Sequence, residues 1–383
     1  RKMGRPPHGG APGFVSEEGT NVIRIGLLTS GGDCQALNAT MRGIVKTISA
    51  SAKKTGEKVE IYGFEDGYQG LIYDRCRKMD WADFSGILTR GGTILGTSRT
   101  PFKRLDIPEA DGVEKVPAMK KTYAAHKLDC LFVLGGNGST KTANRLREEG
   151  LNVIALPKTI DNDTWGTDIT FGFTSAIDVA TRCIDDIHTT ASSHGRVFVI
   201  EIMGHKVGWI PLYAGVAGGA DVILIPEIPY DMDNVVKAIA DREKVGGRFS
   251  IVVVAEGAIS KREAAMKKKE YKQLVAQRVK PSVAYDIAEE IAHRTDAEVR
   301  VAVPGHTQRG GQPDAQDRLF ATQCGVEAAL GFLRGEFGYM IAKVGGKMVH
   351  VPLEEVAGKL KYVDPESDLV REARAMGISF GDE

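Results

Sequence analysis

A polar stretch that directly follows an apolar run is the part of the sequence best suited to chemistry. Residues 153–168 read VIALPKTIDNDTWGTD, which places three acids and a lysine after an expected buried strand. A hydroxyl that accepts a phosphoryl group needs a carboxylate to take its proton, while a metal and cations hold the transferring phosphate. Asp161 and Asp163 supply carboxylates, Lys158 a positive charge and Thr159 a hydroxyl. We expect one acid to face the substrate hydroxyl and the other to orient the loop or metal-bound waters.

Two glycine-rich turns could hold the phosphates of the donor. In LLTSGGDCQALNATMR, residues 27–42, a strand is expected to end at Thr29-Ser30 and a helix to begin near Ala36. LGGNGST, residues 134–140, repeats this arrangement. Bare N–H groups at a helix start bind anions, and glycine lets phosphate approach closely. Either turn alone could be an ordinary strand–helix connection, but the pair suggests a polyphosphate held by two loops. Neither matches G-x-G-x-x-G or the Walker A pattern, so a nicotinamide dehydrogenase is disfavoured.

A third group of polar residues suits a sugar phosphate. Arginine and histidine bind phosphate oxygens by charge-assisted hydrogen bonds, and glutamate suits sugar hydroxyls. Each residue alone could equally form a surface ion pair or cap a loop, but all are expected at the carboxyl edges of strands, where ligands bind in open α/β sheets. The candidates, in HTTASSHGR, EIMGHK, VVVAEGA and PGHTQRGG, are Arg196, Met203, Gly204, His205, Glu256, His306 and Arg309.

Short apolar runs alternate with helical patterns along the chain. Strands rich in Val, Ile and Leu that alternate with helices indicate parallel sheets covered on both faces. We expect about eight or nine strands, too many for one comfortable sheet. The predicted fold class is therefore α/β, with two Rossmann-like α/β domains, mostly parallel sheets and an active-site cleft between the domains. The basic helical stretch at residues 259–280 is expected to be a solvated helix or flap, with a cleft-covering lid as the alternative.

Composition excludes several classes of protein. The 383 residues include 50 basic and 50 acidic side chains, so no overall charge attracts nucleic acid or a membrane surface. No apolar run approaches the roughly 20 residues that a membrane helix needs. Five scattered cysteines fit reduced thiols better than disulfides, which predicts a cytoplasmic protein. Residues 1–21 carry no apolar signal segment and are expected to be a disordered or artificial lead-in.

Taken together, these stretches resemble the phosphofructokinase family, which phosphorylates fructose 6-phosphate at its 1-hydroxyl. The motifs GLLTSGGD, GGTILGTSR, GGNGS, PKTIDND, SSHGR, EIMGHKVGW and GHTQRGG occur in the family's order from about Val22 onward. PKTIDND and the ending DLVREARAMGISFGD look most like the long-chain bacterial branch, which mixes ATP and pyrophosphate users. The resemblance implies a glycolytic, Mg²⁺-dependent kinase that makes fructose 1,6-bisphosphate.

The resemblance also implies roles for individual residues. The nucleotide-binding set would be Gly32, Arg99, Thr100, Gly136, Asn137, Gly138 and Ser139. The substrate-binding set would be Thr159, Ile160, Asp161, Arg196, Met203, Gly204, His205, Glu256, Arg300, His306, Thr307, Gln308 and Arg309. Asp161 would be the general base. Arg196 and Arg300 would reach the sugar phosphate bound by a neighbouring subunit, which implies a homodimer or homotetramer with shared sites.

The implied domains are discontinuous in sequence. A nucleotide- or donor-binding domain would contain residues 22–172 and 308–358. A sugar-phosphate-binding domain would contain residues 173–307 and 359–383.

Two positions depart from the usual family pattern. Asn137 stands where an aspartate is linked to Mg²⁺; its amide oxygen can still coordinate the metal but carries no charge. Asp33 and Asp161 could compensate. His205 replaces an arginine, so a fixed cation becomes a group that titrates near neutrality. These departures leave open a non-catalytic sugar-phosphate-binding paralogue, or an enzyme with another acceptor such as sedoheptulose 7-phosphate.

The phosphate donor is indicated by two residues that point in opposite directions. Within the family, glycine at Gly138 leaves room for the α-phosphate of ATP, whereas aspartate fills that space and favours pyrophosphate. Lys158 is typical of the pyrophosphate enzymes. Because lysine can tolerate ATP but a blocked pocket cannot, ATP is the expected donor and pyrophosphate the alternative.

Allosteric control is expected to be weak or absent. Arg42 and Lys46 match the arginines and lysines with which bacterial members bind an effector nucleotide between subunits. The remaining effector positions hold His188, Asp221, Gly247 and Phe249, which make a poor phosphate site as a set.

Overall fold

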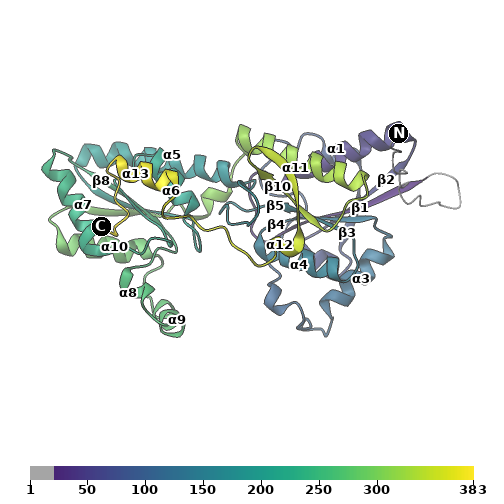
Figure 1. Ribbon diagram of the computed structural model, residues 1–383, viewed down its shortest axis with the longest axis horizontal. Helices are drawn as coiled ribbons and strands as arrows, with labels where there is room; N and C mark the ends of the chain where they lie inside the picture. Colours follow the sequence, from purple (N-terminus) through teal and green to yellow (C-terminus); the bar gives the residue numbers. More distant parts are fainter. Residues whose placement is uncertain (1–20) are drawn as a thin grey trace, which may run out of the picture. The chain divides into compact units, whose positions relative to one another are not determined.

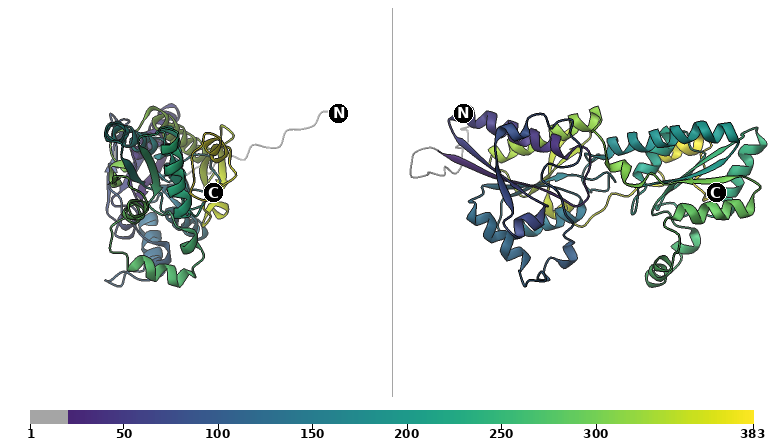
Figure 2. Two further views of the ribbon diagram at one scale, coloured as in Figure 1. Left: turned by 90° about the vertical axis from the view of Figure 1, so that its left-hand side faces the viewer. Right: turned by 180° about the vertical axis from the view of Figure 1, so that it is seen from behind.

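The computed structural model describes residues 21–383, which divide into two compact units (Figures 1 and 2). The first unit contains the described residues up to Lys158, together with Gly166–Phe171 and Ala315–Lys359. The second contains Thr159–Trp165, Gly172–Asp314 and Leu360–Glu383. The expected lead-in falls almost entirely on residues 1–20, which lie outside the described residues.

The first unit is built on one seven-stranded sheet with the order β11-β10-β5-β4-β1-β2-β3. The pairs β1–β2, β1–β4, β4–β5 and β5–β10 are parallel, and only the edge pairs β2–β3 and β10–β11 are antiparallel. Every residue of β4 and β5 is buried, as parallel strands covered on both faces require. The strands are β1 (Val22–Ser30), β2 (Lys58–Phe64), β3 (Cys76–Met79), β4 (Cys130–Gly135), β5 (Val153–Pro157), β10 (Tyr339–Val344) and β11 (Lys347–Pro352).

Helices cover both faces of this sheet. Figure 1 shows α1 (Leu37–Thr55) and α11 (Ala315–Leu333) on one face, and α3 (Lys115–Ala125), α4 (Asn137–Glu148) and α12 (Leu353–Val356) on the other. The second face encloses an apolar core that also includes α2 (Tyr68–Ile72). Two short 3₁₀ helices complete the unit, η1 (Trp81–Phe84) and η2 (Phe102–Arg104).

The second unit contains a four-stranded, wholly parallel sheet with the order β7-β8-β6-β9. The strands are β6 (Val197–Ile202), β7 (Val222–Leu224), β8 (Ser250–Ala255) and β9 (Val299–Ala302). One face packs against α7 (Met232–Lys244) and α10 (Val283–Arg294) in a second apolar core. The other face carries α5 (Phe173–His194) and α6 (Trp209–Ala217), which also pack on each other. The remaining elements are α8 (Lys261–Ala264), α9 (Lys268–Ala276), η3 (Gly305–Arg309) and α13 (Asp368–Ala375).

The predicted α/β class with mostly parallel sheets is confirmed, but the expected strand number was too low. The described residues contain eleven strands. The three that were missed, β3, β10 and β11, all lie in antiparallel edge pairs. β3 and β11 are the edge strands, and they are less buried, so their sequences lack the continuous apolar run of a buried parallel strand. β10 lies inside the sheet, and its first four residues are buried. β11 has no buried residue, and β3 has one.

The basic stretch at residues 259–280 forms two short helices, α8 and α9, neither of which buries a residue. Figure 1 shows α9 projecting from the rest of its unit. This agrees with a solvated segment, and the lid alternative stays untested. Within residues 21–383, no helix combines the length and apolar character needed to cross a membrane.

The contact between α1 and α11 depends on two glycines. A Cβ atom on Gly325 would lie 2.2 Å from the carbonyl oxygen of Thr40, and one on Gly43 would lie 2.9 Å from that of Thr322. Because both obstacles are backbone atoms, neither can be relieved by turning a side chain. The two helix backbones can therefore touch only because both positions lack a Cβ atom.

Gly325→Ala should therefore destabilise the protein, by about 1–3 kcal/mol as expected for overpacking. Helix propensity alone would make the variant more stable, since alanine is favoured over glycine by about 1 kcal/mol in a helix. Denaturant unfolding measures the change. Gln323→Ala, on the exposed side of the same helix, is the matched control and should leave stability within about 0.5 kcal/mol. A stabilised Gly325→Ala variant would contradict the close helix contact.

Candidate active site

The turn after β1 is held by a buried lysine. Gly31 has φ +88°, a conformation that favours glycine, and its N–H donates to Ser98 O at 3.0 Å. The ammonium of Lys158, at the end of β5, donates to Gly32 O, and the residue is only 4% exposed. A Cβ on Gly31 would lie 3.6 Å from Lys158 Nζ and 3.8 Å from Ser139 Oγ. The structure thus brings together Gly32, Ser139 and Lys158, three of the predicted donor residues.

The second glycine turn leads from β4 into the start of α4. A Cβ on Gly135 would lie 2.3 Å from Ser139 Cβ, so the strand end and the first helical turn are in close contact. Gly136 is the N-cap and has no side chain to satisfy the free N–H groups of that turn. The first turn contains no acid, whereas the last contains two arginines. The helix dipole therefore presents an open positive end, which favours an anion.

Gly138 is not required by the fold. It lies in the first turn of α4 without a positive φ, and a Cβ there would meet nothing within 4 Å among the described residues. Glycine in a helix costs about 1 kcal/mol relative to alanine. Since neither packing nor backbone conformation demands glycine here, the space beside it is available to a ligand.

Arg99 and Thr100 follow the segment that pairs with the first turn. Thr97 Oγ1 donates to Gly31 O at 2.7 Å, and Ser98 accepts the hydrogen bond from Gly31 already described. Arg99 is exposed. Thr100 Oγ1 is buried and has no hydrogen-bond partner within residues 21–383. Because buried hydroxyls are nearly always bonded, this group is a candidate to bond a ligand.

The residues predicted to bind the donor could also hold a magnesium ion, provided that phosphate supplies most of its ligands. Asn137 uses its amide N–H group to bond Lys359 O, which leaves its Oδ1 as the atom able to coordinate a metal. Asp33, beside the first turn, supplies a half-exposed carboxylate. Among residues 21–383, no cluster of three His, Cys, Asp or Glu ligands lies at these turns. Mg²⁺ commonly takes only one or two protein oxygens together with substrate phosphates and water, so this sparse set is sufficient.

Cys34, near Lys158, is not a nucleophile in this arrangement. Burial raises the pKa of its thiol to about 12, against the opposing effect of the Lys158 charge. The thiol therefore stays protonated at neutral pH.

The segment predicted to face the acceptor, in the second unit, is a turn rather than an extended strand. Asn162 has φ +53°, which is uncommon for a residue with a side chain. Asp161 N–H donates to Thr159 Oγ1 at 3.1 Å, so that hydroxyl has a structural function. Ile160 is buried, while Asp161 and Asp163 stay partly accessible. Two carboxylates are thus presented on either side of a buried asparagine.

The turn is held by a segment that lies 200 residues further along the chain. Lys361 donates from Nζ to Asn162 Oδ1 at 2.9 Å and from its backbone N–H to Asp163 O at 2.9 Å. Trp209 Nε1 in turn donates to Lys361 O at 2.9 Å. Lys361 and Trp209 could not be predicted from the sequence, because no local pattern connects them to the acid turn.

The third acid of the opening stretch has a different position. Asp168 belongs to the first unit, where its carboxylate accepts from Gly345 N at 2.7 Å and its N–H donates to Lys343 O. It therefore stabilises the β10–β11 hairpin rather than joining the other two acids.

The loops after β6, β8 and β9 form one polar cluster. Gly257 N–H donates to Gly204 O at 3.2 Å, and a Cβ on Gly257 would lie 2.0 Å from His205 O. The fully buried Gln308 accepts from Met203 N at 3.1 Å and donates to Gly305 O. The cluster thus unites the predicted residues Met203, Gly204, His205, Glu256, His306, Thr307, Gln308 and Arg309. Glu256, His205, His306 and Thr307 are exposed and available to a ligand.

Two predicted arginines lie apart from this cluster. Arg196 directly precedes β6 and Arg300 lies near the start of β9, so both are at the amino ends of strands. The expectation that Arg196 lies at a carboxyl edge was therefore wrong. Arg196 Nε lies 3.0 Å from a Glu298 carboxylate oxygen, and Arg300 pairs with the same group. The Arg196 guanidinium beside it lowers the pKa of Glu298.

The positions expected to make a poor effector site contact one another. Arg242 Nη1 lies 2.8 Å from Asp221 Oδ1, and Arg242 Nε donates to Phe249 O at 2.7 Å. The His188 ring packs edge-on against Phe249, with centroids 5.0 Å apart. Weak or absent effector control stays a prediction.

The chain is similar to known proteins over most of its length. The sequence profile of the family described as Phosphofructokinase matches residues 24–331. The chain is 53% identical to an ATP-dependent 6-phosphofructokinase of Spirochaeta thermophila, covering 93% of this chain and 97% of that protein. It is 46% identical to ATP-dependent 6-phosphofructokinase 3 of Bacteroides thetaiotaomicron, covering 94% of this chain and 100% of that protein.

Solved structures show the same fold. Phosphofructokinase of Pichia pastoris in the T-state superposes with a TM-score of 0.73 at 31% identity, over 91% of this chain and 39% of that one. A pyrophosphate-dependent phosphofructokinase from Nitrosospira multiformis superposes with a TM-score of 0.75 at 22% identity, over 94% of this chain and 92% of that one. At this identity the likeness is evidence for the fold alone. With a profile that spans most of its length and relatives of such high identity, the chain belongs to the phosphofructokinase family.

Proposed function

We propose that this protein is an ATP-dependent 6-phosphofructokinase, which transfers the γ-phosphoryl group of ATP to the 1-hydroxyl of fructose 6-phosphate in glycolysis. One observation supports the proposal above all. Gly32, Ser139 and Lys158 lie close together where two turns lead into helices, and Gly138 beside them is a glycine that the fold does not require. The names of the high-identity relatives support the same donor and reaction.

In this proposal the two units have different substrates. The first unit holds the donor phosphates through the N–H groups of its two turns and the Lys158 ammonium. The second holds fructose 6-phosphate through Glu256, His306 and Arg309, which follow its strands. The donor and sugar-phosphate domains expected from the sequence had other bounds, because residues 159–165 and 308–314 were placed in the donor domain but belong to the second unit.

Asp161 is the proposed general base. The sugar hydroxyl must lose its proton as it attacks phosphorus, and a partly accessible carboxylate in a turn fixed by Lys361 is suited to accept it. Mg²⁺ would be held by the donor phosphates with Asn137 Oδ1 and Asp33, and would neutralise phosphate charge. Lys158 adds a fixed positive charge on the donor side.

A homo-oligomer with shared sites is also part of the proposal. Arg196 and Arg300 lie at the amino ends of the strands whose carboxyl ends lead into the sugar-phosphate cluster. Within one chain they pair with Glu298, so their proposed substrate contact is with a neighbouring subunit. All five cysteines are free thiols, which supports a reducing compartment such as the cytoplasm.

Asp161→Asn should lower kcat by about 10²–10⁴-fold, the usual contribution of a general base, with ATP binding nearly unchanged. The measurement is steady-state formation of fructose 1,6-bisphosphate, together with calorimetric titration of ATP. Asp168→Asn is the matched control, because this nearby acid serves the β10–β11 hairpin, and kcat should stay within a few-fold. Near-normal turnover by Asp161→Asn would rule out its role as the base.

Gly138→Asp should lower kcat/KM for ATP by about 100-fold or more, since the new carboxylate would enter the space assigned to the nucleotide and repel its phosphates. Stability should not fall, because the space is open and an acid suits the first helical turn. Gly138→Ala, which adds one methyl group and no charge, is the control, and its kcat/KM for ATP should fall far less. If ATP serves Gly138→Asp as well as it serves the parent enzyme, this residue does not select the donor.

A further inference from the structure

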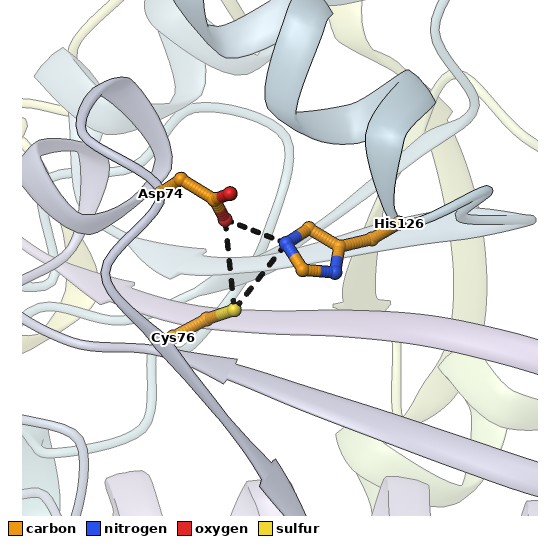
Figure 3. Close-up of side chains that lie close together, drawn as sticks. All are labelled: Asp74, Cys76 and His126. Atoms are coloured by element: carbon orange, nitrogen blue, oxygen red, sulfur yellow. Dashed lines mark hydrogen bonds and ion pairs between the residues drawn. The ribbon is translucent and has the colours of Figure 1, made fainter.

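Three potential metal ligands converge at the edge of the first unit. Asp74 lies in the turn before β3, Cys76 is the first residue of β3, and His126 is the C-cap of α3. Figure 3 shows the three side chains pointing toward one another. His126 Nε2 lies 2.5 Å from Asp74 Oδ1 and 3.5 Å from Cys76 Sγ, and Cys76 Sγ lies 3.8 Å from Asp74 Oδ1. None of the three belongs to the proposed donor or acceptor sets.

These distances are close to those of a tetrahedral metal site. With zinc–ligand bonds of about 2.0–2.3 Å, the sulfur lies about 3.5 Å from each neighbouring ligand atom, and nitrogen and oxygen lie about 3.3 Å apart. The two sulfur distances already agree to within about 0.3 Å. The nitrogen–oxygen distance is that of a hydrogen bond and would have to lengthen by about 0.8 Å. Asp74 is 51% exposed, so its side chain has the freedom to make this shift.

The histidine ring is fixed by its surroundings. Its centroid lies 4.6 Å from that of Tyr62 and 6.2 Å from that of Phe64, and the side chain is only 22% exposed. Phe64 is also the ladder partner of Cys76 in the β2–β3 pair. Two of the three ligands are therefore positioned by regular elements before any metal binds, which reduces the entropic cost of binding.

The local charges favour a cation. Within residues 21–383, the only ion-pair partner of Asp74 is His126, because the neighbouring Arg75 pairs with Asp66 at 3.6 Å. Glu65 adds a further negative charge close enough to act on Cys76. A positive ion would thus meet acidic groups without displacing an arginine or lysine.

We propose that Asp74, Cys76 and His126 form a binding site for a borderline-soft divalent metal ion of the zinc class. Thiolate and imidazole select such ions, whereas Mg²⁺ and Ca²⁺ require oxygen ligands. On binding, the Cys76 thiol releases its proton to solvent, and the proton on His126 Nε2, which bonds Asp74, moves through solvent to Nδ1 so that the ring stays neutral. Sulfur–metal and nitrogen–metal bonds then form, and water completes the coordination. The ion links the edge strand β3 to the end of α3, two elements that are 36 or more residues apart in sequence.

The test uses Co²⁺ as a spectroscopic probe of the metal-stripped full chain. We expect one equivalent of Co²⁺ to produce a thiolate-to-cobalt charge-transfer band, which Zn²⁺ removes and Mg²⁺ does not. Cys76→Ser should abolish the band and weaken Zn²⁺ binding at least tenfold. Cys183→Ser, which changes a partly buried thiol on α5, is the matched control. It should retain both the charge-transfer band and the Zn²⁺ affinity of the parent protein.

A second variant keeps the test decisive if Cys76→Ser folds poorly. Asp74→Asn changes an exposed side chain of nearly the same shape, and should keep the band but weaken Zn²⁺ binding about tenfold. Absence of the band from the parent protein, or its persistence in Cys76→Ser, would overturn the proposal. Equal Zn²⁺ affinity of the parent and Asp74→Asn would also do so, and the cluster would then be an ion pair only.

Discussion

The proposed donor site of this protein depends on one buried cation, Lys158. An ammonium group taken out of water is costly unless it is bonded and its charge is balanced. Lys158 bonds the carbonyl of Gly32, at the point where β5 ends. Its position beside Gly31 and Ser139 brings the end of β1, the start of α4 and a positive charge to one place. A ligand with several negative charges would be bound well at this position, because the ammonium group and the N–H groups at the helix start can all donate to it.

The acceptor side depends in the same way on a long-range contact. Asp161 and Asp163 are presented by a turn whose central residue, Asn162, has a backbone conformation that is uncommon outside glycine. Such a conformation persists only when its surroundings enforce it. Lys361 does so through two hydrogen bonds, and Trp209 holds Lys361 in place. The geometry of the proposed base is therefore controlled by the C-terminal segment of the chain.

Much of the fold and of the donor site could be predicted from the sequence because those features are local. The apolar run, the glycines and the helix start at the ends of β1 and β4 are contiguous, so their physical meaning can be recognised in a short window. The buried parallel strands were recognised for the same reason. The end of β1 at Ser30 and the start of α1 at Leu37 lie where the sequence placed them, to within a residue.

The features that could not be predicted are those that arise from tertiary contacts. Arg196 was expected at a carboxyl edge, since the sequence does not show where a strand begins to within one residue. Lys361 has no sequence signal that relates it to Asn162. Asp74 and Cys76 are close in sequence, but His126 joins them only because α3 ends beside the edge strand.

We propose that the open space at Gly138, rather than the lysine at position 158, decides the phosphate donor. The most direct measurement is the initial rate of fructose 1,6-bisphosphate formation from fructose 6-phosphate and Mg²⁺, with either ATP or pyrophosphate as donor. We expect turnover with ATP and little or none with pyrophosphate. Turnover with pyrophosphate alone would contradict it, because the charge of Lys158 would then outweigh the room left for a nucleotide.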